Sequence, residues 1–343
     1  MFLIRIEWRQ IKMANSIRVI QYGLGPIGCA TAQYIIEHRG LELVGGVDID
    51  SNKIERDIGH VIGITKTLGL SIKKTIGEVL ADTTADVVMQ TTNSYFDLFK
   101  TQIIDILEAG LDIVSTSEEL SFPWIANKKN GEEIDAVAKR VGKTVLGTGV
   151  NPGFLMDALP LNLTSICQQV DHISATRNIN ASERRGPFQK KIGSGMSVDE
   201  FMDKMDEGRM GHVGLPESVG MIFDTFGKNL KNYEASVEPV VAEKLTKTDF
   251  FEVEPGKVKG LKQVARGYTE DEEFVKLTFI AALDYDHGGD VIKITGKPNL
   301  EVNLKGTNGD IATAAIAVNA IKRVHPAAPG LVTMRDLPIV HAG

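Results

Sequence analysis

Between Ile17 and Gly149, short apolar segments alternate with segments of helical periodicity, and this alternation constrains the fold more than any other feature. Strands are predicted over 17–22, 41–48, 86–92, 112–117 and 144–149, and helices over 26–38, 132–141 and a segment ending at Ala109. Strands separated by helices of this length form βαβ units, in which the strands run parallel. The sequence therefore predicts a Rossmann-type, parallel-sheet α/β domain over residues 14–150.

The pattern changes beyond Pro152. Helices are predicted over 153–165, 196–207 and 217–230, and strands over 170–180, 235–245, 274–284, 290–296 and 300–305. Such a grouping is typical of an α+β domain with a mostly antiparallel sheet. We expect residues 151–308 to form a substrate and dimerisation domain. Residues 309–343 are expected to form a helix over Asp310–Val324, ended by Pro326, and a tail, both returning to the first domain.

A glycine-rich turn directly follows the first predicted strand and opens the first helix. It reads Gly23-Leu24-Gly25-Pro26-Ile27-Gly28. In such a turn the first glycine permits the tight bend, the second allows the backbone to approach a pyrophosphate, and the third allows helix and strand to pack closely. Proline suits the first helical position, and the free N–H groups of a helix N-terminus bind phosphate. The motif predicts a dinucleotide site at Gly23, Gly25, Pro26, Ile27 and Gly28.

Polar residues at the ends of the next strands extend this predicted site. Asp48 ends the second strand, where a carboxylate accepts hydrogen bonds from the adenosine ribose. It would repel a 2′-phosphate and so favours NAD without excluding NADP; the alternative is that Asp48 or Asp50 caps the next helix. Thr92 and Asn93 end the third strand and are expected to line the dinucleotide groove, with helix capping as the alternative for Asn93.

The predicted chemistry depends on Glu118 and Glu119, which follow the fourth strand near the expected position of the nicotinamide. A carboxylate beside an apolar wall has a raised pKa and can take the proton of a substrate ammonium before hydride transfer. It can then stabilise the iminium product and activate the water that hydrolyses it. Phe122 and Trp124 are the expected wall. The alternative is a surface acidic pair that starts a helix, and spacing alone does not decide between the two.

Three residues of the second domain are weaker candidates for substrate binding. Asn151, in a turn after the fifth strand, contacts the nicotinamide or the substrate, or only closes the turn. His212 binds a substrate carboxylate or water, or is a solvated loop histidine. Arg177 pairs with an anionic group, or lies on the surface. The basic segment 182–195 is interpreted as a lid over the substrate or as a solvated run of charge.

Five segments carry a resemblance to a known family: GLGPIG at 23–28, TTNSYF at 91–96, STSEELSFPW at 115–124, GTGVNPGF at 147–154 and HPAAPGLVTMRDLP at 325–338. Together they resemble the 2,4-diaminopentanoate dehydrogenases among the native amine dehydrogenases, whose fold is similar to dihydrodipicolinate reductase and homoserine dehydrogenase. The resemblance implies NAD- or NADP-dependent oxidation of the C4 amine of 2,4-diaminopentanoate to 2-amino-4-oxopentanoate and ammonia. It also implies a catalytic glutamate. Superimposing the lysine-containing strand end of homoserine dehydrogenases places Glu118, rather than Glu119, at the lysine's position.

Composition excludes several other classes of protein. The net charge is −7 without a basic block, which argues against nucleic-acid binding, and no apolar run is long enough to span a membrane. Two cysteines, Cys29 and Cys167, are too few for a disulfide framework or a structural zinc site, and we expect buried thiols in a reducing cytosol. No cluster has metal-site spacing.

We therefore expect a cytoplasmic homodimer that acts on a small-molecule amine and binds no metal, nucleic acid or membrane. Residues 1–16 do not read as a signal peptide, and an extension ahead of a start at Met13 is one interpretation. Two alternative functions stay open: an alcohol oxidoreductase of homoserine-dehydrogenase type, and a non-catalytic NAD-binding sensor.

Overall fold

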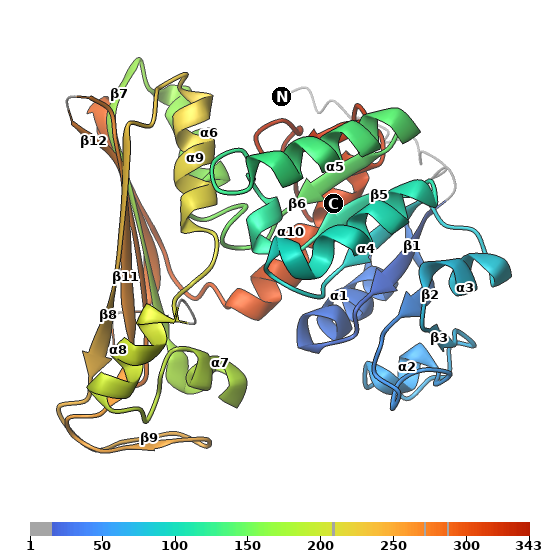
Figure 1. The fold of residues 1–343 in the computed structure, drawn as a ribbon, viewed down its shortest axis with the longest axis horizontal. Coiled ribbons are helices and arrows are strands. Elements are labelled where there is room, and N and C mark those ends of the chain that lie inside the picture. Colours follow the sequence, from blue (N-terminus) through green and yellow to red (C-terminus); the bar gives the residue numbers. More distant parts are fainter. Residues whose placement is uncertain (1–15, 208–209, 271, 287) are drawn as a thin grey trace, which may run out of the picture.

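The protein is described here by a computed structural model covering residues 16–343 apart from 208–209, 271 and 287. The interpretations of the first 15 residues, as no signal peptide or as an extension ahead of Met13, lie outside the described residues. Figure 1 shows a helix-covered sheet on one side of the molecule and a second sheet on the other, with helix α10 running between them. Within the described part of the chain, no helix is long and apolar enough to cross a membrane.

The first sheet has seven strands in the order β15-β6-β5-β4-β1-β2-β3, and all its pairs are parallel. Five strands match the prediction: β1 (Ile17–Tyr22), β2 (Leu41–Val47), β4 (Val87–Gln90), β5 (Asp112–Ser115) and β6 (Thr144–Gly147). Two short edge strands, β3 (Ile72–Lys73) and β15 (Gly330–Val332), were not predicted. The Rossmann-type fold class is confirmed.

Helices cover both faces of this sheet, which is why its central strands are apolar at successive positions. Val19, Val87 and Met89 pack with α1 (Pro26–Glu37) and α10 (Gly309–Val324). Ile20 and Val88 point the other way, toward α4 (Phe96–Glu108) and α5 (Lys128–Val141). The remaining helices here are α2 (Ile58–Val61) and α3 (Ile76–Asp82). The C-terminal helix thus lies against the first sheet, while the domain boundaries at 14–150, 151–308 and 309–343 stay a prediction.

The second sheet has the order β14-β13-β7-β12-β11-β8, and its pairs are antiparallel except β7 with β12. Its strands are β7 (Gln169–Asn180), β8 (Asn232–Val241), β11 (Val258–Tyr268), β12 (Glu273–Ala282), β13 (Gly289–Lys297) and β14 (Leu300–Leu304), and a separate hairpin joins β9 (Thr246–Lys247) to β10 (Glu252–Val253). The helices are α6 (Ala158–Leu163), α7 (Gly186–Lys191), α8 (Val198–Asp206) and α9 (Leu215–Thr225). This confirms the α+β prediction.

Two expectations in this region were wrong. Strand β11 was missed, because its lysines and glycines obscure the alternation; a Cβ on Gly260 would lie 2.1 Å from the Ala281 carbonyl oxygen of β12, so close strand pairing needs the glycine. The helix expected over 153–165 begins only at Ala158, since the buried Asp157 carboxylate accepts from the N–H groups of Gly153 and Ala158. The basic segment 182–195, interpreted as a lid or a solvated run of charge, contains the short helix α7, and neither interpretation is tested by this. Cys29 and Cys167 are half-buried free thiols rather than buried ones.

Candidate active site

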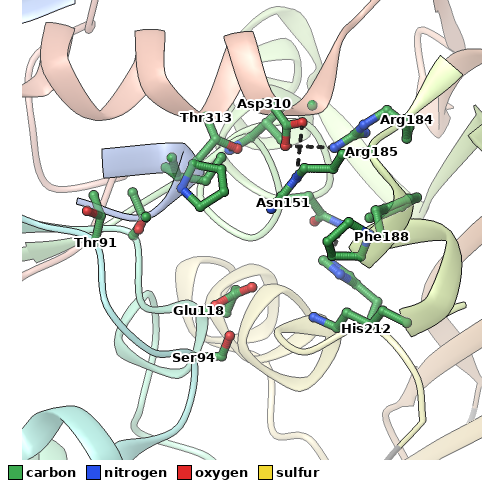
Figure 2. A pocket seen from close by; sticks show the side chains of 18 of the residues that line it. Thr91, Ser94, Glu118, Asn151, Arg184, Arg185, Phe188, His212, Asp310 and Thr313 are labelled. Carbon is green, nitrogen blue, oxygen red and sulfur yellow. Dashed lines mark hydrogen bonds and ion pairs between the residues drawn. The ribbon is translucent and has the colours of Figure 1, made fainter. Parts of the chain in front are cut away.

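A cavity of about 400 Å³ opens where the carboxyl ends of the parallel strands meet the second sheet (Figure 2). It brings together residues from many separate segments of the chain. They are the glycine turn (Gly25, Pro26, Ile27), the β4 end (Thr91, Thr92, Asn93, Ser94), the β5 and β6 ends (Thr116, Glu118, Val150, Asn151), the basic segment with β7 (Arg177, Ile179, Arg184, Arg185, Pro187, Phe188, Lys191) and, from later elements, His212, Phe279, Gly309, Asp310 and Thr313.

The glycine turn has the geometry that a dinucleotide needs. Gly23 has a φ of +89°, a conformation that L side chains rarely adopt. A Cβ on Gly28 would lie 1.9 Å from the Gly23 carbonyl oxygen, so helix α1 can approach β1 only because this residue is glycine. A Cβ on Gly25 would meet nothing within 4 Å, and no side chain caps the helix there. The turn therefore leaves an open space at the α1 N-terminus that fits a pyrophosphate.

Asp48 lies at the end of β2 and is buried. Its Oδ2 accepts from the Leu24 N–H at 2.8 Å and from Lys53 Nζ at 3.0 Å, and its Oδ1 accepts from the Asp50 N–H at 2.9 Å. Burial opposes ionisation, but these donors together hold the pKa of Asp48 below its usual value. A carboxylate has about four acceptor positions, so one is left for a ribose hydroxyl. Asp48 caps neither of the next helices, since α2 is capped by Asp57 and α3 by Thr75.

Replacing Asp48 with alanine is expected to raise the Kd for NAD about 10- to 100-fold, the effect of losing a hydrogen bond to a charged group. The Kd for NADP should rise much less, because Lys53, which pairs with Asp48 in the structure, is then free to meet a 2′-phosphate. Binding titrations of both cofactors measure the ratio. The half-buried Asp50, whose carboxylate lies 3.7 Å from the same Lys53, is the control when replaced in the same way; an unchanged NAD-to-NADP ratio in the Asp48 variant would assign ribose recognition to another residue.

The two glutamates after β5 have different surroundings. Glu118 begins a short 3₁₀ turn (Glu118–Leu120), is half-buried and lines the cavity. Glu119 instead accepts from the backbone N–H of Phe96 at 2.7 Å, at the start of α4. Burial raises the pKa of Glu119, and the Phe96 N–H only partly offsets this. Of the pair, Glu118 is therefore the one placed to meet a substrate.

Two expectations near this pair do not match the structure. Phe122 and Trp124 pack against one another with tilted rings whose centroids are 5.9 Å apart, and neither is among the residues that line the cavity. Asn93 lines the cavity but does not cap α4, because Tyr95 is the cap residue and Glu119 supplies the acceptor. Thr92 also lines the cavity, and its hydroxyl donates to Gln102 of α4 at 2.7 Å.

A third glutamate near this pair was missed by the sequence analysis. Glu217 lies in the first turn of α9 with only 3% of its surface exposed. Burial, together with the charges of Glu119 and Glu118, raises the pKa of Glu217 to about 8. An acid at a helix N-terminus is so common that its position in the sequence does not distinguish Glu217 from an ordinary surface residue. Near neutral pH this side chain is mostly protonated, which keeps a third negative charge away from Glu118.

The titration of Glu217 is expected to reduce stability at high pH. Its pKa is higher in the folded chain than in the unfolded chain, so its contribution is complete below about pH 4.5 and is lost as the pH rises through about 8. Glu217→Gln should therefore flatten the fall in unfolding free energy between about pH 5 and 8, by on the order of 2–4 kcal/mol. Chemical denaturation across this range measures it; parallel curves for both proteins would exclude a titrating Glu217. Glu118, Glu119 and Tyr233 are the titratable groups coupled to it.

The opposite end of the cavity is cationic. Arg177, on β7, is 2% exposed, and its Nη1 has no hydrogen-bond partner among the described residues. Asp290 is its nearest carboxylate, at 4.0 Å from Nε. Arg184, Arg185 and Lys191 line the same region. The alternative of a surface position for Arg177 is wrong, and a buried guanidinium with a free donor is suited to an anionic group.

Asn151 and His212 lie together beside this cationic end (Figure 2). His212 stacks on Phe279 with ring centroids 4.5 Å apart, so it is not a solvated loop residue. Burial and the nearby charges of Lys191 and Arg177 lower its pKa to about 3, so the ring is neutral. Asn151 Nδ2 lies 2.9 Å from His212 Nε2. Asn151 Oδ1 is buried, and no described residue donates to it.

Comparison with known proteins agrees with this geometry. The sequence model of the 2,4-diaminopentanoate dehydrogenase C-terminal domain matches residues 154–343. The 2,4-diaminopentanoate dehydrogenase of Acetoanaerobium sticklandii is 32% identical over 351 aligned positions, covering 96% of this chain and 95% of the relative. The chain belongs to the 2,4-diaminopentanoate dehydrogenase family. It is an NAD(P)-dependent dehydrogenase that acts on amines, which confirms the resemblance seen in its sequence.

Solved structures of low sequence identity show the same fold. An amine dehydrogenase from Mycobacterium smegmatis matches with a TM-score of 0.84 at 24% identity, over 95% of this chain and 97% of that one. A biliverdin reductase from Synechocystis, in complex with biliverdin and NADP⁺, matches with a TM-score of 0.53 at 12% identity, over 93% and 94% of the two chains. At these identities the matches support the two-part architecture and nothing finer.

Proposed function

We propose that this enzyme oxidises the C4 amine of 2,4-diaminopentanoate to give 2-amino-4-oxopentanoate and ammonia. The strongest support is the distribution of charged side chains in the cavity, with an acidic residue at one end and basic residues at the other. Figure 2 shows Glu118 on one side and Arg184 and Arg185 on the other, with Asn151 between them. A substrate with an amine at one end and a carboxylate at the other matches this arrangement, and 2,4-diaminopentanoate, for which the Acetoanaerobium sticklandii relative is named, has both.

The cationic end binds and orients the substrate. The free Nη1 donor of Arg177 takes the substrate carboxylate. Asn151 Oδ1 accepts from a substrate N–H. Because the carboxylate is fixed at this end, the amine farther along the chain is the one that reaches Glu118.

The acidic end carries out the proton transfers. Glu118 takes a proton from the substrate ammonium, because the free amine loses hydride more readily than the ammonium does. A nicotinamide dinucleotide would supply the hydride acceptor, and the residues that would hold it are Gly23, Gly25, Pro26, Ile27, Gly28, Asp48, Thr92 and Asn93. Once Glu118 has released that proton to solvent, its carboxylate stabilises the cationic imine and takes a proton from the water that attacks the imine carbon; this proton is passed to the nitrogen, which leaves as ammonia when the carbonyl forms.

The experiment that tests this follows products in a panel of initial-rate assays with NAD and with NADP. Substrates are 2,4-diaminopentanoate, simple amines and homoserine. The proposal requires ammonia and reduced cofactor to form in a 1:1 ratio from the diamino acid. Cofactor reduction with homoserine and without ammonia would support an alcohol oxidoreductase instead, and cofactor binding with no turnover on any substrate would support a sensor.

We also propose that the enzyme is a cytoplasmic homodimer. The support is that α7, α8 and α9 lie on one side of the six-stranded sheet, while Figure 1 shows its other side without a covering helix. A flat sheet face of this kind is suited to an isologous contact with a second copy. Light scattering of the purified protein tests this, with twice the 37.3 kDa chain mass as the expected value. A monomer at micromolar concentration would contradict it.

A further inference from the structure

Asp310 is a carboxylate at the cationic end of the cavity that the function proposed above leaves without a role. It lies in the first turn of α10, which faces the cavity through Gly309, Asp310 and Thr313. Its Oδ1 accepts from Arg184 Nη2 at 2.8 Å, and its Oδ2 lies 3.6 Å from Arg185 Nε. About a third of the side chain, 34%, is exposed. These two contacts do not use all the acceptor positions of the Asp310 carboxylate, so it can accept further hydrogen bonds.

A carboxylate here is unfavourable if the site binds only an anion. A like charge beside the substrate carboxylate weakens its binding and reduces the free charge of Arg184 and Arg185. The cost disappears if the ligand brings a cation next to its carboxylate, as the zwitterionic head group of an α-amino acid does. The arginines and Asp310 then form a matched pair of charges for that head group.

We propose that Asp310 binds the second ammonium of the substrate, the one on the carbon next to the carboxylate, and so makes the enzyme specific for amino acids that carry a further amine. This inference rests on the proposed function, since it assigns the remaining charged group of the same substrate. It makes Asp310 a specificity residue: it touches the end of the substrate that does not react.

The other explanation of this ion pair is a latch between α10 and the segment before α7. A latch holds the cavity walls together and so affects every substrate alike. A binding site for the second ammonium affects only substrates that have one. The two explanations therefore predict different effects on the ratio of kcat/KM between a substrate that has a second ammonium and one that lacks it. The rate with one substrate alone does not distinguish them.

The test compares kcat/KM for 2,4-diaminopentanoate and for 4-aminopentanoate, which has the same reacting amine and carboxylate but no second ammonium. Asp310→Asn should lower the ratio of the two values about 10- to 100-fold, as expected for losing one charge-assisted hydrogen bond. Asp310→Glu, which keeps the charge, should retain most of the ratio. Asp203→Asn, on the exposed face of α8, is the control for removing a carboxylate, and thermal melts check that each variant is folded.

An equal loss on both substrates in Asp310→Asn would overturn the inference in favour of the latch, and an unchanged ratio would overturn it as well. If the unaltered enzyme oxidises neither substrate, the proposed function fails, and this inference fails with it. If it oxidises both with equal kcat/KM, the proposed reaction stands and only the assignment of Asp310 is wrong.

Discussion

Replacing Glu118 with glutamine is expected to lower kcat for amine oxidation about 10²- to 10⁴-fold, while the Kd for the cofactor changes less than about threefold. Glutamine keeps the size and one oxygen acceptor of the side chain but cannot accept a proton. Glu118 lines the cavity but is not among the residues that we assign to the cofactor, so cofactor affinity should be preserved. Stopped-flow measurement of cofactor reduction at saturating amine, with fluorescence titration of cofactor binding, separates the two effects.

Glu119 provides a matched control in the adjacent position. Its carboxylate holds the N-terminus of α4 through the Phe96 N–H, and glutamine keeps the acceptor needed for that bond. Glu119→Gln should therefore lower kcat less than tenfold. A near-normal rate in Glu118→Gln, or the same loss in both variants, would remove Glu118 from the proton-transfer step.

The second large effect is expected at Gly28. An alanine there would place its Cβ 1.9 Å from the Gly23 carbonyl oxygen and 2.7 Å from Thr91 Oγ1, so either α1 or the turn must shift. Overpacking of this kind costs about 1–3 kcal/mol of folding stability. Because the shift moves the turn itself, cofactor binding should weaken at least tenfold as well. Urea denaturation and cofactor titration measure the two losses.

Gly25→Ala is the comparison that separates packing from cofactor binding. Its Cβ would meet no atom of the protein within 4 Å, and its φ of −70° suits any residue. Its stability should fall by less than about 1 kcal/mol, the cost of a poorer helix cap. Its cofactor affinity should nonetheless fall clearly, because the methyl group occupies the space for the pyrophosphate. Unchanged affinity would place the phosphates elsewhere.

The first domain could be read from the sequence because its signals are local. The strand, glycine turn and helix around Gly23–Gly28 lie next to one another in the chain, and the buried strands are apolar on both faces. Strand β15 could not be predicted from local sequence, since its three residues near the C-terminus form a strand only by pairing with β6, which is far away in the sequence. Strand β11 was hidden because its glycines serve a contact with β12, which the sequence does not show.

The same distinction holds for the site. Glu118 and Asp48 stand at strand ends, and the parallel sheet brings strand ends together, so their positions were predictable. Asp310 was not identified as a site residue, because its proposed role depends on its ion pair with Arg184, which is 126 residues away in the sequence. Glu217 looked like an ordinary helix-start acid, and only the three-dimensional neighbourhood of Glu118 and Glu119 distinguishes it. Phe122 and Trp124 were assigned to the cavity from their nearness in sequence, and this was wrong.

The role of Glu118 as the base for the C4 amine is tested most directly by a crystal structure of the enzyme with NAD⁺ and a non-oxidisable analogue of 2,4-diaminopentanoate. We expect a Glu118 carboxylate oxygen about 2.6–3.2 Å from the C4 nitrogen of the analogue, and the analogue's carboxylate at Arg177. An analogue bound in the opposite direction, with its C4 nitrogen against Asp310 and Glu118 facing solvent, would contradict it.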